Sequence, residues 1–167
     1  MSQTDKNLEE AFDDECLTYV RYLAFARQAE EEGFPNVARL LRATAEGEKV
    51  HAMNQIEALG SVRSTVENVE FAVHEEEGDF FRLYPEFIRE AQAEDRTEAV
   101  MSMTWIQQAE KAHFGLLKQA LEMLREGHDS DKEDYYLCTN CGLVVEGASP
   151  ATCPICKAPQ QMFTHIT

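Results

Sequence analysis

A four-residue motif, Glu-Lys-x-His, occurs twice in this chain, 62 positions apart. The copies are Glu48–His51 and Glu110–His113, and each lies at the same place within a longer repeated unit. Nearer the start of the units the offset is 61, which pairs Glu15 with Glu76 and means that the second unit gains one residue before Tyr84. A repeat at a fixed offset is one structural unit written twice. The chain is therefore predicted to contain two helical hairpins, each with a glutamate on its first helix and Glu-x-x-His on its second.

The repeated glutamates and histidines form a candidate set of metal ligands. Residues at i and i+3 share a helix face, so the carboxylate and the imidazole of each motif can reach one point in space. Four helices around one axis would bring six such side chains together, which is typical of carboxylate-bridged di-iron or di-manganese sites. The set consists of Glu15, Glu48, His51, Glu76, Glu110 and His113. A solvated acidic face would explain any one of these glutamates, but not their register in the repeat.

The charge balance narrows the classes of partner. The 167 residues include 31 acidic and 15 basic side chains, for a formal net charge of -16. Such an acidic chain is expected to bind neither nucleic acid nor an anionic membrane surface. Residues 1–15 are polar and acidic, without the apolar core of a signal peptide, and no apolar run is long enough to span a membrane. We therefore expect a cytoplasmic protein.

Helical periodicity and its breakers predict four helices before the first of the clustered cysteines. Their expected limits are about 7–32, 36–59, 64–93 and 96–126. The sequence from Ser64 to Glu67 predicts a capping box at the start of the third helix. Pro85 lies inside this helix and should kink it near Tyr84, because proline removes a backbone donor. The extra residue gained between Glu76 and Tyr84 fits a π-type bulge.

Two Cys-x-x-Cys pairs near the end of the chain predict a tetrahedral metal site. They are Cys138-x-x-Cys141 and Cys153-x-x-Cys156. Four thiolates hold zinc structurally or iron for one-electron transfer, and spacing alone does not choose between them. We expect an all-α four-helix bundle over residues 1–127, a charged linker over 128–134 and a small four-cysteine domain over 135–167.

Taken in this order, the motifs resemble those of the rubrerythrin family, in which a ferritin-like di-iron bundle is fused to a C-terminal rubredoxin-like domain. The resemblance covers nearly the whole chain. It rests on Glu15 with Tyr22, Glu48-x-x-His51-Ala52, Glu76-x-x-Asp79, Leu83-Tyr84-Pro85, Glu110-x-x-His113 and the two cysteine pairs. It implies two non-haem irons in the bundle and one redox-active iron in the four-cysteine site, where spacing alone also allows zinc.

The resemblance further implies a peroxidase that reduces hydrogen peroxide to water in defence against oxidative stress. Electrons would be relayed through the rubredoxin-like centre, and a ligand carboxylate or the hydroxyls of Tyr22 and Tyr84 would assist proton delivery by hydrogen bonding. A separate rubredoxin or NAD(P)H-dependent reductase is the expected donor, because the chain has no Gly-rich dinucleotide motif. The family also implies a head-to-tail homodimer with donor and acceptor centres in different subunits.

Two other functions use the same residues. A ferritin-like ferroxidase would oxidise ferrous ion with oxygen at the bundle ligands. A non-enzymatic protein would use a zinc ribbon for docking and hold a structural metal in the bundle. The fused four-cysteine domain favours the peroxidase over the ferroxidase, since iron storage needs no attached electron-transfer module.

Three positions depart from the family pattern. Asp79 stands where a second glutamate is usual, and its shorter side chain would reach a metal only if the helix bulges. Leu143 and Lys157 stand where tyrosine and glycine are common in the rubredoxin-like domain. A cation at Lys157 would favour the more negative reduced centre and so raise its potential, unless solvent screens it.

Overall fold

The computed structural model describes residues 2–131 and 134–167. It forms two compact units, residues 1–63 and 64–167. The predicted domain limits at 127 and 135 stay a prediction, and residues 132–133 of the predicted linker lie outside the described residues.

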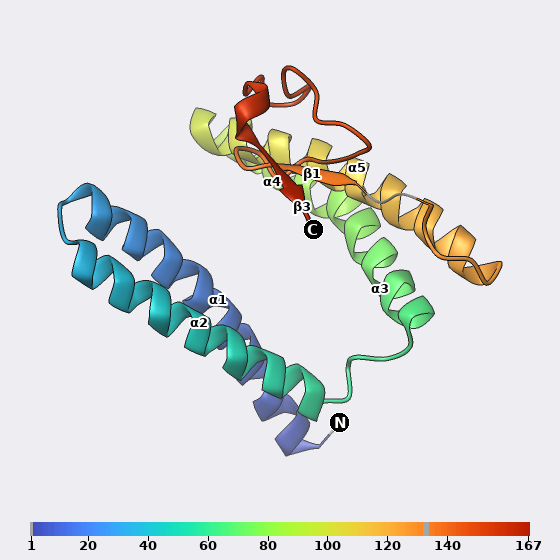
Figure 1. The fold of residues 1–167 in the computed structure, drawn as a ribbon, viewed down its shortest axis with the longest axis horizontal. Coiled ribbons are helices and arrows are strands. Elements are labelled where there is room, and N and C mark those ends of the chain that lie inside the picture. Colours follow the sequence, from blue (N-terminus) through green and yellow to red (C-terminus); the bar gives the residue numbers. More distant parts are fainter. Residues whose placement is uncertain (1, 132–133) are drawn as a thin grey trace. The chain divides into compact units, whose positions relative to one another are not determined.

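The first unit is an antiparallel hairpin of α1 (Gln3–Glu31) and α2 (Pro35–Ala58) (Figure 1). Helix α1 begins earlier than predicted, because Ser2 and Asp5 form a capping box. The Ser2 hydroxyl accepts from the Asp5 amide at 3.1 Å, and the Asp5 carboxylate accepts from the Ser2 amide at 2.7 Å. At the turn Gly33 has φ +84°, which favours glycine, and Pro35 begins α2 where no amide donor is needed.

Small residues form the contact between α1 and α2. The buried residues described for this hairpin are Ala26, Ala29, Ala38, Ala45 and Ala52. Alanine lets the two backbones approach closely but buries little apolar area. Larger apolar side chains stay in solvent, and Val20 and Leu40 are 62% and 63% exposed. The hairpin therefore has no large hydrophobic core of its own.

The second unit contains a longer helical hairpin. Its first arm consists of α3 (Thr65–Gly78), the π-helical segment η1 (Asp79–Leu83) and α4 (Tyr84–Ala93), and its second arm is α5 (Thr97–Arg125). The predicted capping box of Ser64 and Glu67 is present at the start of α3. Helix α5 packs against α3, η1 and α4, and Arg125 pairs with Glu70 at 2.7 Å.

The π-helical segment confirms the predicted bulge and explains how the chain accommodates Pro85. The Tyr84 amide donates to the Asp79 carbonyl, five residues earlier. In that register the Phe80 carbonyl would accept from residue 85, but proline has no amide hydrogen. The side chain of Gln107 on α5 donates to this carbonyl instead, at 3.2 Å. The predicted kink near Tyr84 is thus a one-residue bulge that ends in the first turn of α4.

The four-cysteine domain is a three-stranded antiparallel sheet with its metal-ligating loops at one end. Strand β1 (Tyr135–Cys138) lies between β2 (Val144–Glu146) and β3 (Phe163–Ile166), and a short 3₁₀ helix, η2 (Gln160–Met162), precedes β3. Cys138, Leu143 and Cys153 are its buried core. Ala112 of α5 packs against this core, so the domain and α5 lie together within the second unit.

The predicted fold class, a helical bundle of two hairpins with a small four-cysteine domain, is confirmed. None of the helices in the described part of the chain is both long and apolar enough to cross a membrane.

Candidate metal centres

The first hairpin brings three of the six predicted ligands to one point. Nδ1 of His51 lies 3.1 Å from Oε2 of Glu48 on the same helix and 3.5 Å from Oε1 of Glu15 on α1. One ligand atom from each residue lies within 4.8 Å of the other two. An ion at about 2.0–2.2 Å from each atom fits such a triangle after small side-chain adjustments.

The second hairpin repeats this arrangement with the equivalent residues. Nδ1 of His113 lies 2.9 Å from Oε2 of Glu110 and 3.7 Å from Oε2 of Glu76 on α3. These atoms also lie within 4.8 Å of one another. Each hairpin thus presents one imidazole and two carboxylates, and the structure brings all six predicted ligands into two clusters of three.

Close packing of carboxylates shifts their proton affinities. Burial and, after it, the neighbouring Glu110 carboxylate together raise the pKa of Glu76 to about 8. In the first cluster a hydrogen bond from Glu15 to Glu48 raises the pKa of Glu15 and lowers that of Glu48. A shared proton of this kind is what a divalent ion would replace.

Asp79 does not belong to either cluster, although it lies at the first position of the π-helical segment. Burial raises the pKa of Asp79, and electrostatic repulsion from the Glu110 carboxylate raises it as well. The predicted role of Asp79 as a metal ligand stays a prediction.

The two predicted tyrosines occupy equivalent places in the two hairpins. The ring of Tyr22 lies 6.4 Å from that of Phe25, and the ring of Tyr84 lies 6.5 Å from that of Phe87. Burial raises the pKa of Tyr84, with further contributions from Glu110 and other nearby carboxylates. The Tyr84 hydroxyl therefore keeps its proton at neutral pH and remains a hydrogen-bond donor.

The four cysteines have the geometry of a tetrahedral metal site. Sγ of Cys138 lies 3.7 Å from Sγ of Cys156, and Sγ of Cys141 lies 3.6 Å from Sγ of Cys153. These distances are far too long for disulfides, and all four are free cysteines. Sulfurs at about 2.3 Å from a central ion would be about 3.8 Å apart in a regular tetrahedron. The four side chains therefore fit a thiolate-bound ion.

Thiol acidity within this site is uneven. Burial raises the pKa of Cys138 and Cys141. Burial acts in the same direction on Cys156, but hydrogen bonds from the Asn140 side chain, the Ala158 amide and two neighbouring cysteines together outweigh it and lower this pKa to about 6. Cys156 thus loses its proton more readily at neutral pH than Cys138 or Cys141 does.

A hydrogen bond joins the second carboxylate cluster to the four-cysteine loop. Nε2 of His113 lies 3.0 Å from the carbonyl oxygen of Gly142, which follows Cys141 directly. With Nε2 as the donor, Nδ1 is left unprotonated and faces Glu110 and Glu76, as a metal ligand requires. Sequence reasoning missed this contact, because the acceptor is a backbone carbonyl. Gln107 was missed for a similar reason, since nothing in its sequence context marks it as a partner for Phe80.

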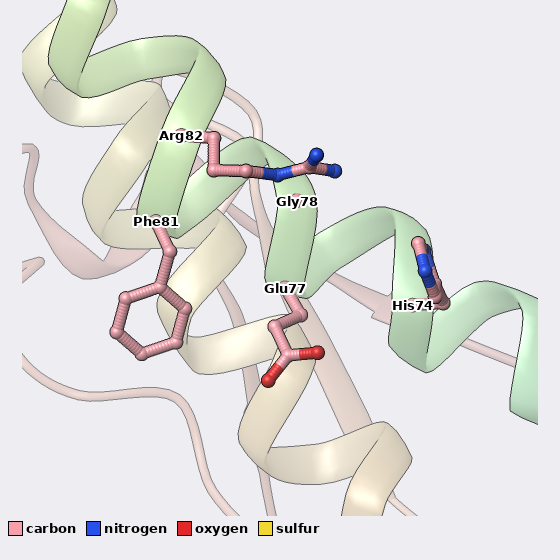
Figure 2. A pocket seen from close by; sticks show the side chains of 5 residues that line it. All are labelled: His74, Glu77, Gly78, Phe81 and Arg82. Carbon is pink, nitrogen blue, oxygen red and sulfur yellow. The ribbon is translucent and has the colours of Figure 1, made fainter.

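A separate shallow pocket lies on the outer face of α3 and η1 (Figure 2). Its volume is about 440 Å³, and it is lined by His74, Glu77, Gly78, Phe81 and Arg82. The Arg82 guanidinium reaches over Gly78, where a side chain would meet Nη2 at 3.0 Å. These lining residues lie outside both carboxylate clusters, so this pocket is distinct from the candidate metal centres.

Family models match both parts of the chain. A model described as rubrerythrin matches residues 6–121, and one described as the rubredoxin-like domain of rubrerythrin matches residues 136–164.

Similar proteins match over nearly their whole length. A rubrerythrin of Clostridium perfringens is 31% identical, over 97% of this chain and 93% of its own. A rubrerythrin of Porphyromonas gingivalis is 32% identical, over 97% and 89%. A solved structure of nigerythrin in a mixed-valence state has a TM-score of 0.57 at 29% identity, covering 99% of this chain and 88% of that one. With the six carboxylate and imidazole ligands and the four cysteines in place, this chain belongs to the rubrerythrin family.

Proposed function

We propose that this chain is a non-haem di-iron peroxidase of the rubrerythrin type, which reduces hydrogen peroxide to water with electrons relayed through its four-cysteine centre. The observation that carries the proposal is the hydrogen bond between His113, a member of the second carboxylate cluster, and Gly142 in the four-cysteine loop. It joins two centres of different chemistry within one unit of the chain.

The donor atoms suit iron at both places. Four carboxylates and two imidazoles can balance the charge of two ferrous or ferric ions, and four thiolates suit a single iron. Structures similar to this chain include nigerythrin in a fully reduced, all-ferrous state, so that relative holds iron. Glu15, Glu48 and His51 would hold one ion of the pair, and Glu76, Glu110 and His113 the other.

When bound, two ferrous ions would supply the two electrons that cleavage of the oxygen–oxygen bond of peroxide takes, and two protons complete two waters. The chain's own residues orient the histidine ligand and donate a hydrogen bond to the peroxide. The Gly142 carbonyl fixes the tautomer of His113, so that Nδ1 faces the cluster. The Tyr84 hydroxyl retains its proton beside the carboxylates and can donate a hydrogen bond to a peroxide oxygen.

The contact between the two centres favours electron delivery over iron storage. From Sγ of Cys141 the covalent path runs through one peptide group to the Gly142 carbonyl, whose oxygen lies 3.0 Å from Nε2 of His113. A ferroxidase takes its electrons directly from its ferrous substrate, so it does not need such a path. We propose a separate rubredoxin or NAD(P)H-dependent reductase as the donor and the cytoplasm as the place of action.

The test begins with anaerobic loading of the full chain with ferrous iron. We expect three irons per chain, and we expect hydrogen peroxide to oxidise both centres quickly, with one peroxide consumed per two electrons. Rapid oxidation by oxygen but not by peroxide would support the ferroxidase instead. In C156S, with the bundle iron retained, a single turnover should persist while steady turnover with the donor is lost. Unchanged steady turnover in that variant would refute the relay.

A further inference from the structure

Each hairpin holds only half of a dinuclear site. The cluster of the first hairpin supplies one imidazole and two carboxylates, and so does that of the second. A carboxylate-bridged pair of ions takes a glutamate from each of two helices and Glu-x-x-His from each of two more. This inference rests on the proposed di-iron function, and it concerns which copy of the chain provides each half.

Each hairpin also lacks the layer that would cover it. In the first hairpin the buried residues described are alanines, while Phe25, whose ring lies beside that of Tyr22, remains 53% exposed. In the second unit Leu83 and Phe87, which flank Tyr84 in the sequence, are 39% and 37% exposed. Two helices cannot form a hydrophobic core alone, and exposed apolar faces of this size mark interaction surfaces. Each hairpin therefore needs a second hairpin against its apolar face.

The connection between the hairpins is short. Helix α2 ends at Ala58 and α3 begins at Thr65, so seven residue steps separate them and reach at most about 25 Å when fully extended. The usable reach is shorter still. The amide of Ser61 donates to the carbonyl of Ile56 at 3.3 Å, and Gly60 has φ +63°, which ties both residues to the end of α2. From Ser61 onward the chain spans only about 14 Å.

A ferritin-like bundle needs a longer connection than this. Such bundles contain one long crossover, because the second and third helices run parallel and the chain must return along the bundle. In α2 the site lies about 13 Å before Ala58, and in α3 Glu76 lies about 17 Å after Thr65, at 1.5 Å per residue. With both ligand groups at one level, the end of α2 and the start of a parallel α3 would be about 30 Å apart along the axis. One chain cannot bridge this distance.

We propose that the di-metal site is assembled from two copies of this chain by exchange of hairpins. Glu15, Glu48 and His51 of one copy meet Glu76, Glu110 and His113 of the other, and the reciprocal exchange forms a second, identical site. The two-fold symmetry closes the assembly and covers the apolar faces of all four hairpins. The four-cysteine loop that contacts His113 belongs to the same chain as that histidine. Each site therefore receives electrons from the chain that provides its second half.

Two complementary variants test the exchange through metal content. The first, E48Q/H51A, disables the first cluster, and the second, E110Q/H113A, disables the second cluster. The two chains carry different tags, are co-expressed and are purified through both tags in turn. In the exchanged dimer one site combines the two intact hairpins and the other combines the two disabled ones. The mixed dimer should therefore bind half as much paired Co²⁺ as the wild-type dimer, whereas each variant alone should bind none. A mixed dimer without paired Co²⁺ would overturn the proposal.

A second measurement needs no metal. Inserting about 25 Gly/Ser residues between Ser61 and Val62 makes the connection long enough to cross the bundle. At low protein concentration, pairing of the two hairpins within one chain is then favoured. We expect sedimentation to show a dimer for the parent chain and a monomer for the extended chain. A parent chain that is monomeric would contradict the exchange. If the masses change as expected but the wild-type chain binds no metal pair, the exchange stands and the proposed di-iron function fails.

Discussion

The carboxylate clusters of the two hairpins contain the same residue types at the same spacing, but their surroundings differ. The His51 side chain is 56% exposed, whereas the His113 side chain is 21% exposed and contacts Gly142 through its second nitrogen. The first arm of the second hairpin contains a π-helical segment, whereas α1 is a regular α-helix. The two hairpins thus have the same types of ligand, and in the second a backbone carbonyl also orients the histidine and connects it to the four-cysteine loop.

The largest expected effect of this difference concerns the two histidines. H113A removes an imidazole that the Gly142 carbonyl already orients, whereas H51A removes a more exposed one. We expect H113A to weaken Co²⁺ binding by about 100-fold or more, and by about tenfold more than H51A does. Co²⁺ titrations followed by visible absorption would measure both losses of affinity. K49A and K111A, from the middle of each motif, are the controls. Equal losses would mean that the contact with Gly142 does not contribute to affinity.

The pH dependence of metal uptake distinguishes the clusters next. Because the pKa of Glu76 is raised to about 8, this carboxyl holds a proton at pH 7 that an incoming ion must displace. Affinity should therefore rise by about tenfold per pH unit up to about pH 8 and then level off. Calorimetry in two buffers with different ionisation enthalpies would count the proton released, and E76Q should release one fewer. An equal count in E76Q would place the displaced proton on another residue.

The same shift affects the stability of the metal-free protein, in the opposite direction. Below about pH 4.5 the carboxyl of Glu76 is protonated in both the folded and the unfolded state. As the pH rises towards 8, the unfolded state loses this proton first, so the free energy of unfolding falls across this range. Urea unfolding at several pH values would show the decline, and E76Q should reduce it.

Most of what the sequence predicted depends on local spacing. Periodicity, capping residues and the offset between repeats depend on neighbours along the chain, and they predicted the helices, the six clustered ligands and the π-type bulge. The start of α1 was predicted too late, because aspartate at position 5 replaces the usual glutamate or glutamine of a capping box. The two contacts that were missed join residues distant in sequence, namely Gln107 with Phe80 and His113 with Gly142. Their acceptors are backbone carbonyls, which any residue provides, so no residue type reveals them.

A smaller effect is expected at the π-helical segment, which only the second hairpin contains. Q107A leaves the Phe80 carbonyl without its donor, since Pro85 cannot replace it. We expect a loss of about 1–2 kcal/mol in the free energy of unfolding. Q108A, on the exposed face of the same helix, is the matched control and should change stability little. If both variants unfold alike, water satisfies this carbonyl and the bulge does not depend on α5.

The smallest effect is expected where the two cysteine loops differ. After Cys141 the chain continues with Gly142 at φ +81°, and after Cys156 it continues with Lys157 at φ +64°, a conformation that costs a side-chain-bearing residue about 1 kcal/mol. K157G should remove this strain and stabilise the domain by about that amount. It also removes an ammonium that donates to the Pro154 carbonyl at 2.7 Å beside the thiolates, so the potential of the iron-loaded centre should fall. K157A separates the two effects, because it removes the charge but keeps the strain. Potentiometry at low and high salt would measure the charge effect, which screening should reduce, and an unchanged potential at low salt would show that solvent already screens the cation.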